Sequence, residues 1–149
     1  MNKQGNEKMG RVVVDVELAN YKDLHRAEEG TLAPEKVRRI HSQGVVDTGA
    51  TRLVLPESVV KQLGLPFIGD TKVRYADGRS TSRQRVEDVR VLLQGREGTF
   101  DALVEPDRTD VLIGAIVLES LDFLVDCQTR QLVPRDPNVI ISEVESLDE

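Results

Sequence analysis

The feature that most constrains the fold is the stretch 45–51, in which two valines lead directly into Asp47-Thr48-Gly49. A second apolar stretch, 53–55, comes directly after it. A carboxylate at the end of a buried strand is unfavourable unless neighbouring groups hydrogen-bond it or it shares a proton. Gly49 indicates a positive φ or the close approach of another backbone, and the Thr48 hydroxyl can both donate and accept. The pattern therefore predicts a carboxylate held rigidly where a strand ends.

The composition favours a single domain built from strands. The 149 residues are 39% hydrophobic and 31% charged, which fits one soluble domain with one core. Aromatic residues make up only 3% and tryptophan is absent, so the core must consist of Val, Leu and Ile. Branched aliphatic residues of this kind are enriched in strands.

The charge and the cysteine content limit the kinds of binding partner and the cellular compartment to be expected. The net charge of −6 argues against a nucleic-acid partner, and the longest apolar runs are too short to span a membrane. The single cysteine, Cys127, cannot form an intrachain disulfide, and residues 1–10 lack the apolar segment of a signal peptide. We therefore expect a cytoplasmic protein.

The first half of the chain alternates strands with breaks. Alternating valines predict a strand over 12–18, and 37–47 predicts a second strand that runs into the Asp turn. The polar segment 20–34 predicts a long connection, in which 21–29 offers at most a helical turn. A proline at its first position and a glycine after its last predict a short helix over 56–63.

The middle of the chain predicts two hairpins. Strands over 71–75 and 80–86 are joined around 76–79, where Asp-Gly is a strong hairpin signal. Strands over 88–94 and 99–105 form the second hairpin.

The last part of the chain ends in short apolar stretches. An apolar strand, 110–114, ends in glycine and precedes a short helix over 115–121. A strand pair, 121–125 with 131–133, and a short apolar run, 139–141, complete the pattern.

The stretch Val46-Asp47-Thr48-Gly49-Ala50 resembles the active-site turn of the retropepsin-like aspartic proteases, the family that includes retroviral proteases. Residues 55–65 resemble the segment after this turn in small bacterial members, and the order of Asp turn, hairpin and apolar strand–Gly–helix is that of the family. The resemblance covers roughly 12–141. It implies a mainly β fold with one or two short helices, the closed β-barrel of acid proteases. We expect a protease domain over 11–141, a flexible lead-in over 1–10 and an acidic tail over 142–149.

The resemblance also implies the roles of the site residues. Asp47 corresponds to the catalytic carboxylate, with Thr48 bracing the two loops of a dimer and Gly49 directing its N–H at the carboxylates. Ala50 corresponds to the floor of the substrate site. The hairpin at 76–78 stands where the family has its flap, a mobile lid over the bound peptide. The expected catalytic residue is Asp47, and the expected residues of the active-site loop are Thr48, Gly49 and Ala50. The flap would consist of Ala76, Asp77 and Gly78, and the residues that support the loop would be Ile113 and Gly114.

The chain contains one Asp-Thr-Gly, whereas hydrolysis by carboxylates requires two. A chain of 149 residues is too short for two such lobes, so a complete dyad requires a twofold-symmetric homodimer. We therefore expect an aspartic endopeptidase that acts as a homodimer on an extended peptide or protein substrate, without a metal or cofactor. His25 and His41 are isolated and suggest no metal site.

Other interpretations of the same residues stay open. Asp-Thr-Gly is also an ordinary turn sequence, and the Asp-Gly hairpin is also an ordinary surface hairpin. The alternative to an endopeptidase is a catalytically silent dimerisation or peptide-binding module on the same fold, and a third, less favoured one is a small-molecule or metal-binding barrel. The chain departs from the viral pattern at 51–52, where an acidic pair is common. The terminal strand that builds the viral dimer could correspond here to 139–141 or 12–16.

Overall fold

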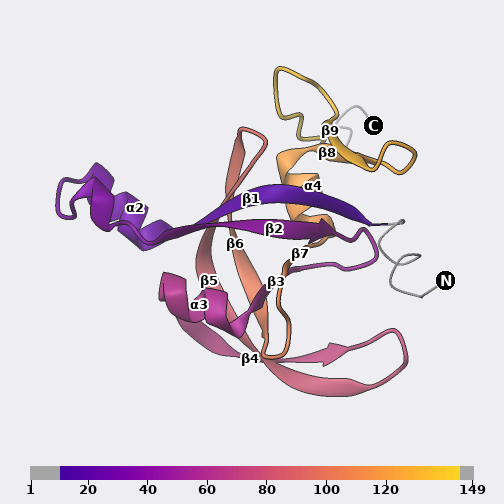
Figure 1. The fold of residues 1–149 in the computed structure, drawn as a ribbon, viewed down its shortest axis with the longest axis horizontal. Coiled ribbons are helices and arrows are strands. Elements are labelled where there is room, and N and C mark those ends of the chain that lie inside the picture. The colour runs from indigo at the N-terminus through magenta and orange to yellow at the C-terminus, as the bar shows by residue number, and fades with distance from the viewer. Residues whose placement is uncertain (1–10, 145–149) are drawn as a thin grey trace.

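A computed structural model describes residues 11–144 of the chain (Figure 1). The predicted lead-in, 1–10, and the tail beyond residue 144 lie outside the described residues. The strands are β1 (Val12–Asn20), β2 (Arg39–Val46), β3 (Leu53–Pro56), β4 (Phe67–Arg74), β5 (Ser80–Leu93), β6 (Arg96–Glu105), β7 (Val111–Ile113), β8 (Phe123–Asp126) and β9 (Gln131–Pro134). The helices are α2 (Tyr21–Glu28), α3 (Glu57–Leu63), α4 (Ala115–Leu121) and a 3₁₀ turn, η1 (Pro34–Lys36).

Six strands close into a barrel in the order β1-β2-β7-β3-β6-β5, because β5 returns to pair with β1. β1 runs antiparallel to β2 from Val12 opposite Val46 onward, and its far end pairs with β5. β4 lies outside this ring as the hairpin partner of β5 (Figure 1). The predicted mainly β fold and the closed acid-protease barrel are therefore confirmed.

Aliphatic side chains fill the interior, as the scarcity of aromatic residues predicts. Each fully buried side chain of this size contributes roughly 1.5–3 kcal/mol relative to an exposed one. The largest buried side chains are Leu18, Leu53, Leu55, Leu63, Leu93, Ile113 and Leu121.

β5 is one continuous strand of 14 residues, so the prediction of separate strands over 80–86 and 88–94 is wrong. The pairing of β5 with β6 shifts between Val86 and Val89, and Asp88 adopts a φ of 65° there. A bulge of this kind bends a strand without ending it. In the sequence, the charged pair at 87–88 looked like the end of one strand and the start of another. In the structure, β5 continues through the bulge and pairs with β4 in its first half and with β1 in its second half.

The segment 20–34 contains the helix α2, where the sequence indicated at most a helical turn. The Asn20 side chain caps it by accepting from the backbone N–H of Asp23 at 3.0 Å. The amide of Asn20 also donates to the backbone oxygen of Leu63 at 2.9 Å, which attaches the start of α2 to the end of α3. The cap is polar, and the bond to Leu63 joins residues 43 apart in the sequence, so an apolar periodicity could reveal neither.

Asp23 anchors α2 to the strand that leads to the Asp turn. Its carboxylate is buried and accepts from Arg38 Nε at 2.8 Å and from Arg38 Nη2 at 3.0 Å. The backbone N–H of Arg38 donates to the same carboxylate at 3.0 Å. These bonds hold the pKa of Asp23 below its usual value.

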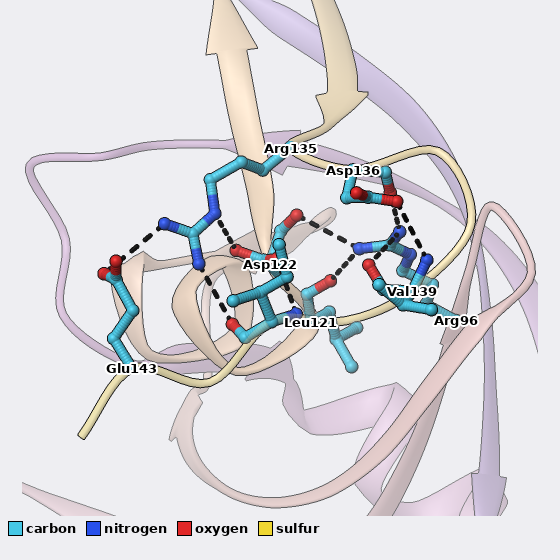
Figure 2. A network of polar contacts seen from close by, with 8 residues as sticks. Arg96, Leu121, Asp122, Arg135, Asp136, Val139 and Glu143 are labelled. Carbon is cyan, nitrogen blue, oxygen red and sulfur yellow. Dashed lines mark hydrogen bonds and ion pairs between the residues drawn. The ribbon is translucent and has the colours of Figure 1, made fainter.

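Two arginines hold the C-terminal segment against the barrel (Figure 2). Arg96 donates to the backbone oxygens of Leu121, Asp122, Asp136 and Val139. Arg135 forms an ion pair with Asp122 at 2.8 Å.

Asp122 in turn accepts from the backbone N–H of Ile141 at 2.9 Å. The run 139–141, considered for a dimer strand, pairs with no strand within 11–144, and its side chains are exposed.

We expect Asp23→Asn to lower the free energy of unfolding by about 1–2 kcal/mol near neutral pH, because it removes the charge from the buried partner of Arg38. The value is modest because the Arg38 side chain is 48% exposed. Since the folded pKa of Asp23 lies below the unfolded value, its contribution is complete above the unfolded pKa, about 3.9, and is lost as the pH falls through the folded pKa.

Urea unfolding of parent and variant at several pH values measures this difference, which should shrink below about pH 4. Asp70→Asn is the matched control, since Asp70 is exposed and forms no ion pair within 11–144. A difference that stayed constant down to about pH 2 would contradict the assignment.

Candidate active site

The Asp turn, 47–52, connects β2 to β3, and β7 lies between these two strands. β7 runs parallel to β2, with Val46 opposite Ile113, and antiparallel to β3, with Val54 opposite Leu112. The strands that enter and leave the turn are therefore both hydrogen-bonded to one short central strand. This arrangement favours an apolar sequence at 111–113, because β7 is paired on both edges and the side chains of Val111 and Ile113 are fully buried.

Backbone hydrogen bonds hold the turn from behind. The N–H of Asp47 donates to the oxygen of Ile113 at 3.0 Å. The N–H of Ala115 donates to the oxygen of Ala50 at 2.8 Å, and that of Ile116 to the oxygen of Thr51 at 2.9 Å. The first N–H groups of α4, which have no partner within a helix, thus find their acceptors in the turn.

Gly114 allows the turn to lie this close. A Cβ at this position would stand 2.5 Å from the backbone oxygen of Arg52 and 2.8 Å from that of Ala50. The neighbouring atoms are backbone and cannot move aside without displacing the turn. The structure thus places both predicted supporting residues, Ile113 and Gly114, directly against the turn.

The Asp47 carboxylate is exposed and is oriented by its own turn. Its Oδ1 accepts from the N–H of Gly49 at 2.9 Å, and its backbone oxygen accepts from the N–H of Ala50 at 3.1 Å. Gly49 does not adopt a positive φ, so that expectation is wrong. The close neighbour is the carboxylate itself, since a Cβ on Gly49 would stand 3.3 Å from Oδ1. Thr48 is exposed beside it.

The segment 76–78 forms the tip of the β4–β5 hairpin. The N–H of Tyr75 donates to the oxygen of Arg79 at 2.8 Å, and Gly78 has a φ of 90°. Asp77 accepts from the backbone N–H of Arg79 at 3.0 Å and from its Nε at 2.7 Å, and these bonds lower the pKa of Asp77. Ala76, Asp77 and Gly78 are all exposed, so the tip is a polar turn closed by its own contacts.

A polar triad ties the base of this hairpin to β6. The Tyr75 hydroxyl donates to Glu105 Oε2 at 2.6 Å, and Arg83 Nε donates to Glu105 Oε1 at 2.9 Å. The hydrogen bond to the carboxylate favours the neutral phenol, so the pKa of Tyr75 is raised. Sequence reasoning missed this triad, because its members lie 22 and 30 residues from Glu105 and carry no motif.

A cavity of about 600 Å³ connects the turn with the hairpin. Gly49 and Ala50 line it, whereas Asp47 and the hairpin tip do not. The lining residues are Gly49, Ala50, Thr51, Arg52, Val54, Val73, Arg74, Tyr75, Leu103, Glu105, Arg108 and Leu112. The structure therefore places a partly apolar hollow beside the turn that carries the Asp47 carboxylate.

Within residues 11–144, no group of His, Cys, Asp or Glu side chains could hold a metal ion. His25 contacts Glu29 at 3.4 Å and His41 contacts Glu17 at 3.2 Å. None of the helices described is long and apolar enough to cross a membrane.

The chain was compared with models of known protein families. A family model described as aspartyl protease matches residues 38–117, just over half of the 149-residue chain. The matched region contains β2, the Asp turn, the β4–β5 hairpin, β7 and the start of α4. No curated protein matches the chain.

We expect Gly114→Ala to lower the free energy of unfolding by about 1–3 kcal/mol, because the new methyl group meets rigid backbone of the turn. Thermal unfolding of parent and variant measures the loss. Gly44→Ala is the matched control: Gly44 is also buried, but its methyl group would meet the flexible end of Ile113 at 2.7 Å and should cost less. An equal or greater loss in the control would contradict the assigned contact.

We expect one tyrosine to ionise above the usual pH of about 10 in an absorbance titration, and this transition should disappear in Tyr75→Phe. Glu105→Gln should move it to lower pH, because the neutral amide no longer opposes the phenolate while Arg83 still favours it. A transition that kept its position in Glu105→Gln would show that the carboxylate does not control Tyr75.

Proposed function

The chain belongs to the retropepsin-like aspartyl protease family, and we propose that it is an endopeptidase in which Asp47 supplies the catalytic carboxylate of each subunit of a homodimer. The observation that carries this proposal is the construction of the turn. β7 and α4 fix its backbone, while the Asp47 carboxylate stays exposed and accepts from Gly49. We assign the protease domain to 11–141 and retain the cytoplasm as the proposed location.

The proposed reaction uses two carboxylates and one water molecule. The ionised carboxylate takes a proton from the water as its oxygen attacks the carbonyl carbon of the peptide. The protonated carboxylate donates to the carbonyl oxygen, which becomes the oxygen of a tetrahedral intermediate. The C–N bond then breaks and the amine leaves with a proton. Two carboxylates close enough to hold one water molecule between them would share one proton, so the pair would work best at mildly acidic pH.

The surface around the turn supports a homodimer. One chain supplies one Asp47, and this residue, Thr48 and Gly49 are all exposed. Apolar side chains are exposed on both sides of the turn. Val13, which lies in β1 opposite Val45 of β2, is 49% exposed, and Ile116 is 43% exposed.

The exposed apolar surface continues toward the C-terminal segment. Ile116 shares a surface hollow with Leu124 and Ile141, which are 54% and 41% exposed. Burial of these side chains against a second copy would remove apolar area from water. On the twofold axis, Thr48 would brace the two turns.

The cavity and the hairpin support a peptide substrate. An extended peptide pairs its backbone with strand edges and places alternate side chains into pockets. The hollow beside Gly49 and Ala50 would serve as such a pocket, and the tip at 76–78 would act as the flap that covers the bound chain.

One observation favours a second candidate, a catalytically silent peptide-binding or dimerisation module. The hairpin tip is polar, and the Asp77 carboxylate already accepts hydrogen bonds from Arg79 of the same turn. A tip of this kind offers little apolar surface with which to exclude water from a bound peptide.

We expect digestion of a diverse peptide library, read by mass spectrometry, to show cleavage that is strongest at mildly acidic pH. Asp47→Asn should lower the rate at least about a thousandfold, because it removes the group that activates water. Asp101→Asn is the control, since Asp101 is exposed and forms no ion pair among the described residues. Full activity in Asp47→Asn would contradict the proposal. Peptide binding without cleavage by the parent protein would favour the catalytically silent module.

A further inference from the structure

We propose that the enzyme prefers substrates with an acidic side chain beside the scissile bond, bound in the cavity that the Asp turn shares with the hairpin. We call this the arginine-lined cavity, after Arg52, Arg74 and Arg108. The inference rests on the proposed function, because it assigns a specificity to the same site.

The charges of the cavity do not balance. Three of its lining residues are arginines, and Glu105 is its single acidic residue. Arg108 is paired, with its Nη2 2.9 Å from Asp110 Oδ1. Arg52 and Arg74 form no ion pair within the part of the chain that the structure describes.

Glu105 cannot neutralise these two arginines. Its Oε2 accepts from Tyr75 and its Oε1 accepts from Arg83, so both oxygens are already engaged. Arg83 also cancels its charge at close range. The cavity thus carries an excess of positive charge in a chain whose net charge is −6. Such a local excess attracts anionic groups and raises their concentration near the site.

The walls of the cavity determine which anion fits. Val54, Val73, Leu103 and Leu112 provide apolar surface between the arginines. A glutamate or aspartate side chain has an apolar stem and an anionic end, and it matches this combination. Guanidinium groups bind carboxylates with two parallel hydrogen bonds, which makes such contacts stronger than neutral ones.

The positions of the two unpaired arginines connect specificity with catalysis. Arg52 belongs to the Asp turn itself, and Arg74 is the last residue of β4, two residues before the hairpin tip. A carboxylate between them would join the rigid turn to the hairpin that covers the substrate. An acidic side chain would therefore favour both binding and closure of the hairpin.

The test uses peptides acetylated at the N-terminus and amidated at the C-terminus, with Glu or Gln at each position flanking the cleaved bond. We expect kcat/KM to be about tenfold higher for Glu than for Gln at one position. The double variant Arg52→Gln/Arg74→Gln should bring this ratio close to one. Arg26→Gln/Lys36→Gln, which removes two charges around α2 on the far side of the molecule from the hairpin, should keep it (Figure 1).

Two further measurements do not depend on the fold of the double variant. The Glu to Gln ratio of the parent should fall as salt rises from about 0.05 to about 0.5 M, because the added ions screen the contact. Fluorescence anisotropy with Asp47→Asn should show the same preference in binding alone. A salt-independent ratio would overturn the inference.

The outcomes separate this inference from the proposed function. Cleavage with a ratio of one overturns the acidic preference and leaves the protease intact. A binding preference for Glu without any cleavage by the parent retains the arginine-lined cavity and overturns the endopeptidase. A preference that survives in Arg52→Gln/Arg74→Gln refutes the assignment to a side chain in this cavity.

Discussion

The contact between the Asp turn and the segment behind it determines the geometry of the whole site. The carbonyl oxygens of Ala50 and Thr51 accept from the first N–H groups of α4, while Asp47 donates to the end of β7. Gly114 makes this approach possible because it has no Cβ. The main chain alone thus orients the Asp47 carboxylate, which stays available to a substrate and to a second chain.

β6 connects this rigid turn to the hairpin. It runs parallel to β3, the strand that leaves the turn, and its last residue, Glu105, holds the base of the hairpin through Tyr75. The same strand supplies part of the cavity wall through Leu103. The pocket is therefore lined by elements that are each fixed to the barrel, and the end of the β4–β5 hairpin projects away from the barrel (Figure 1).

Features that depend on neighbouring residues could be predicted from the sequence, whereas polar contacts between residues far apart in the chain could not. The Asp turn, the Asp-Gly hairpin and the strand before Gly114 each depend on neighbouring residues, so their places in the fold could be predicted. The helix α2 depends on contacts between Asn20 and Leu63, and between Asp23 and Arg38, which no periodicity reports. The bulge that keeps β5 continuous was hidden because charged residues at 87–88 normally indicate a break.

The way Arg96 holds the C-terminal segment has a consequence for how this protein can evolve. Arg96 binds four backbone oxygens, among them those of Asp136 and Val139, and it makes these contacts with no side chain of that segment (Figure 2). Any residue except those that distort the backbone can therefore replace Val139 without loss of the attachment. The exposed side chain at position 139 is therefore free to diversify, and descendants of the chain could acquire new contacts there while the barrel and its turn stay unchanged.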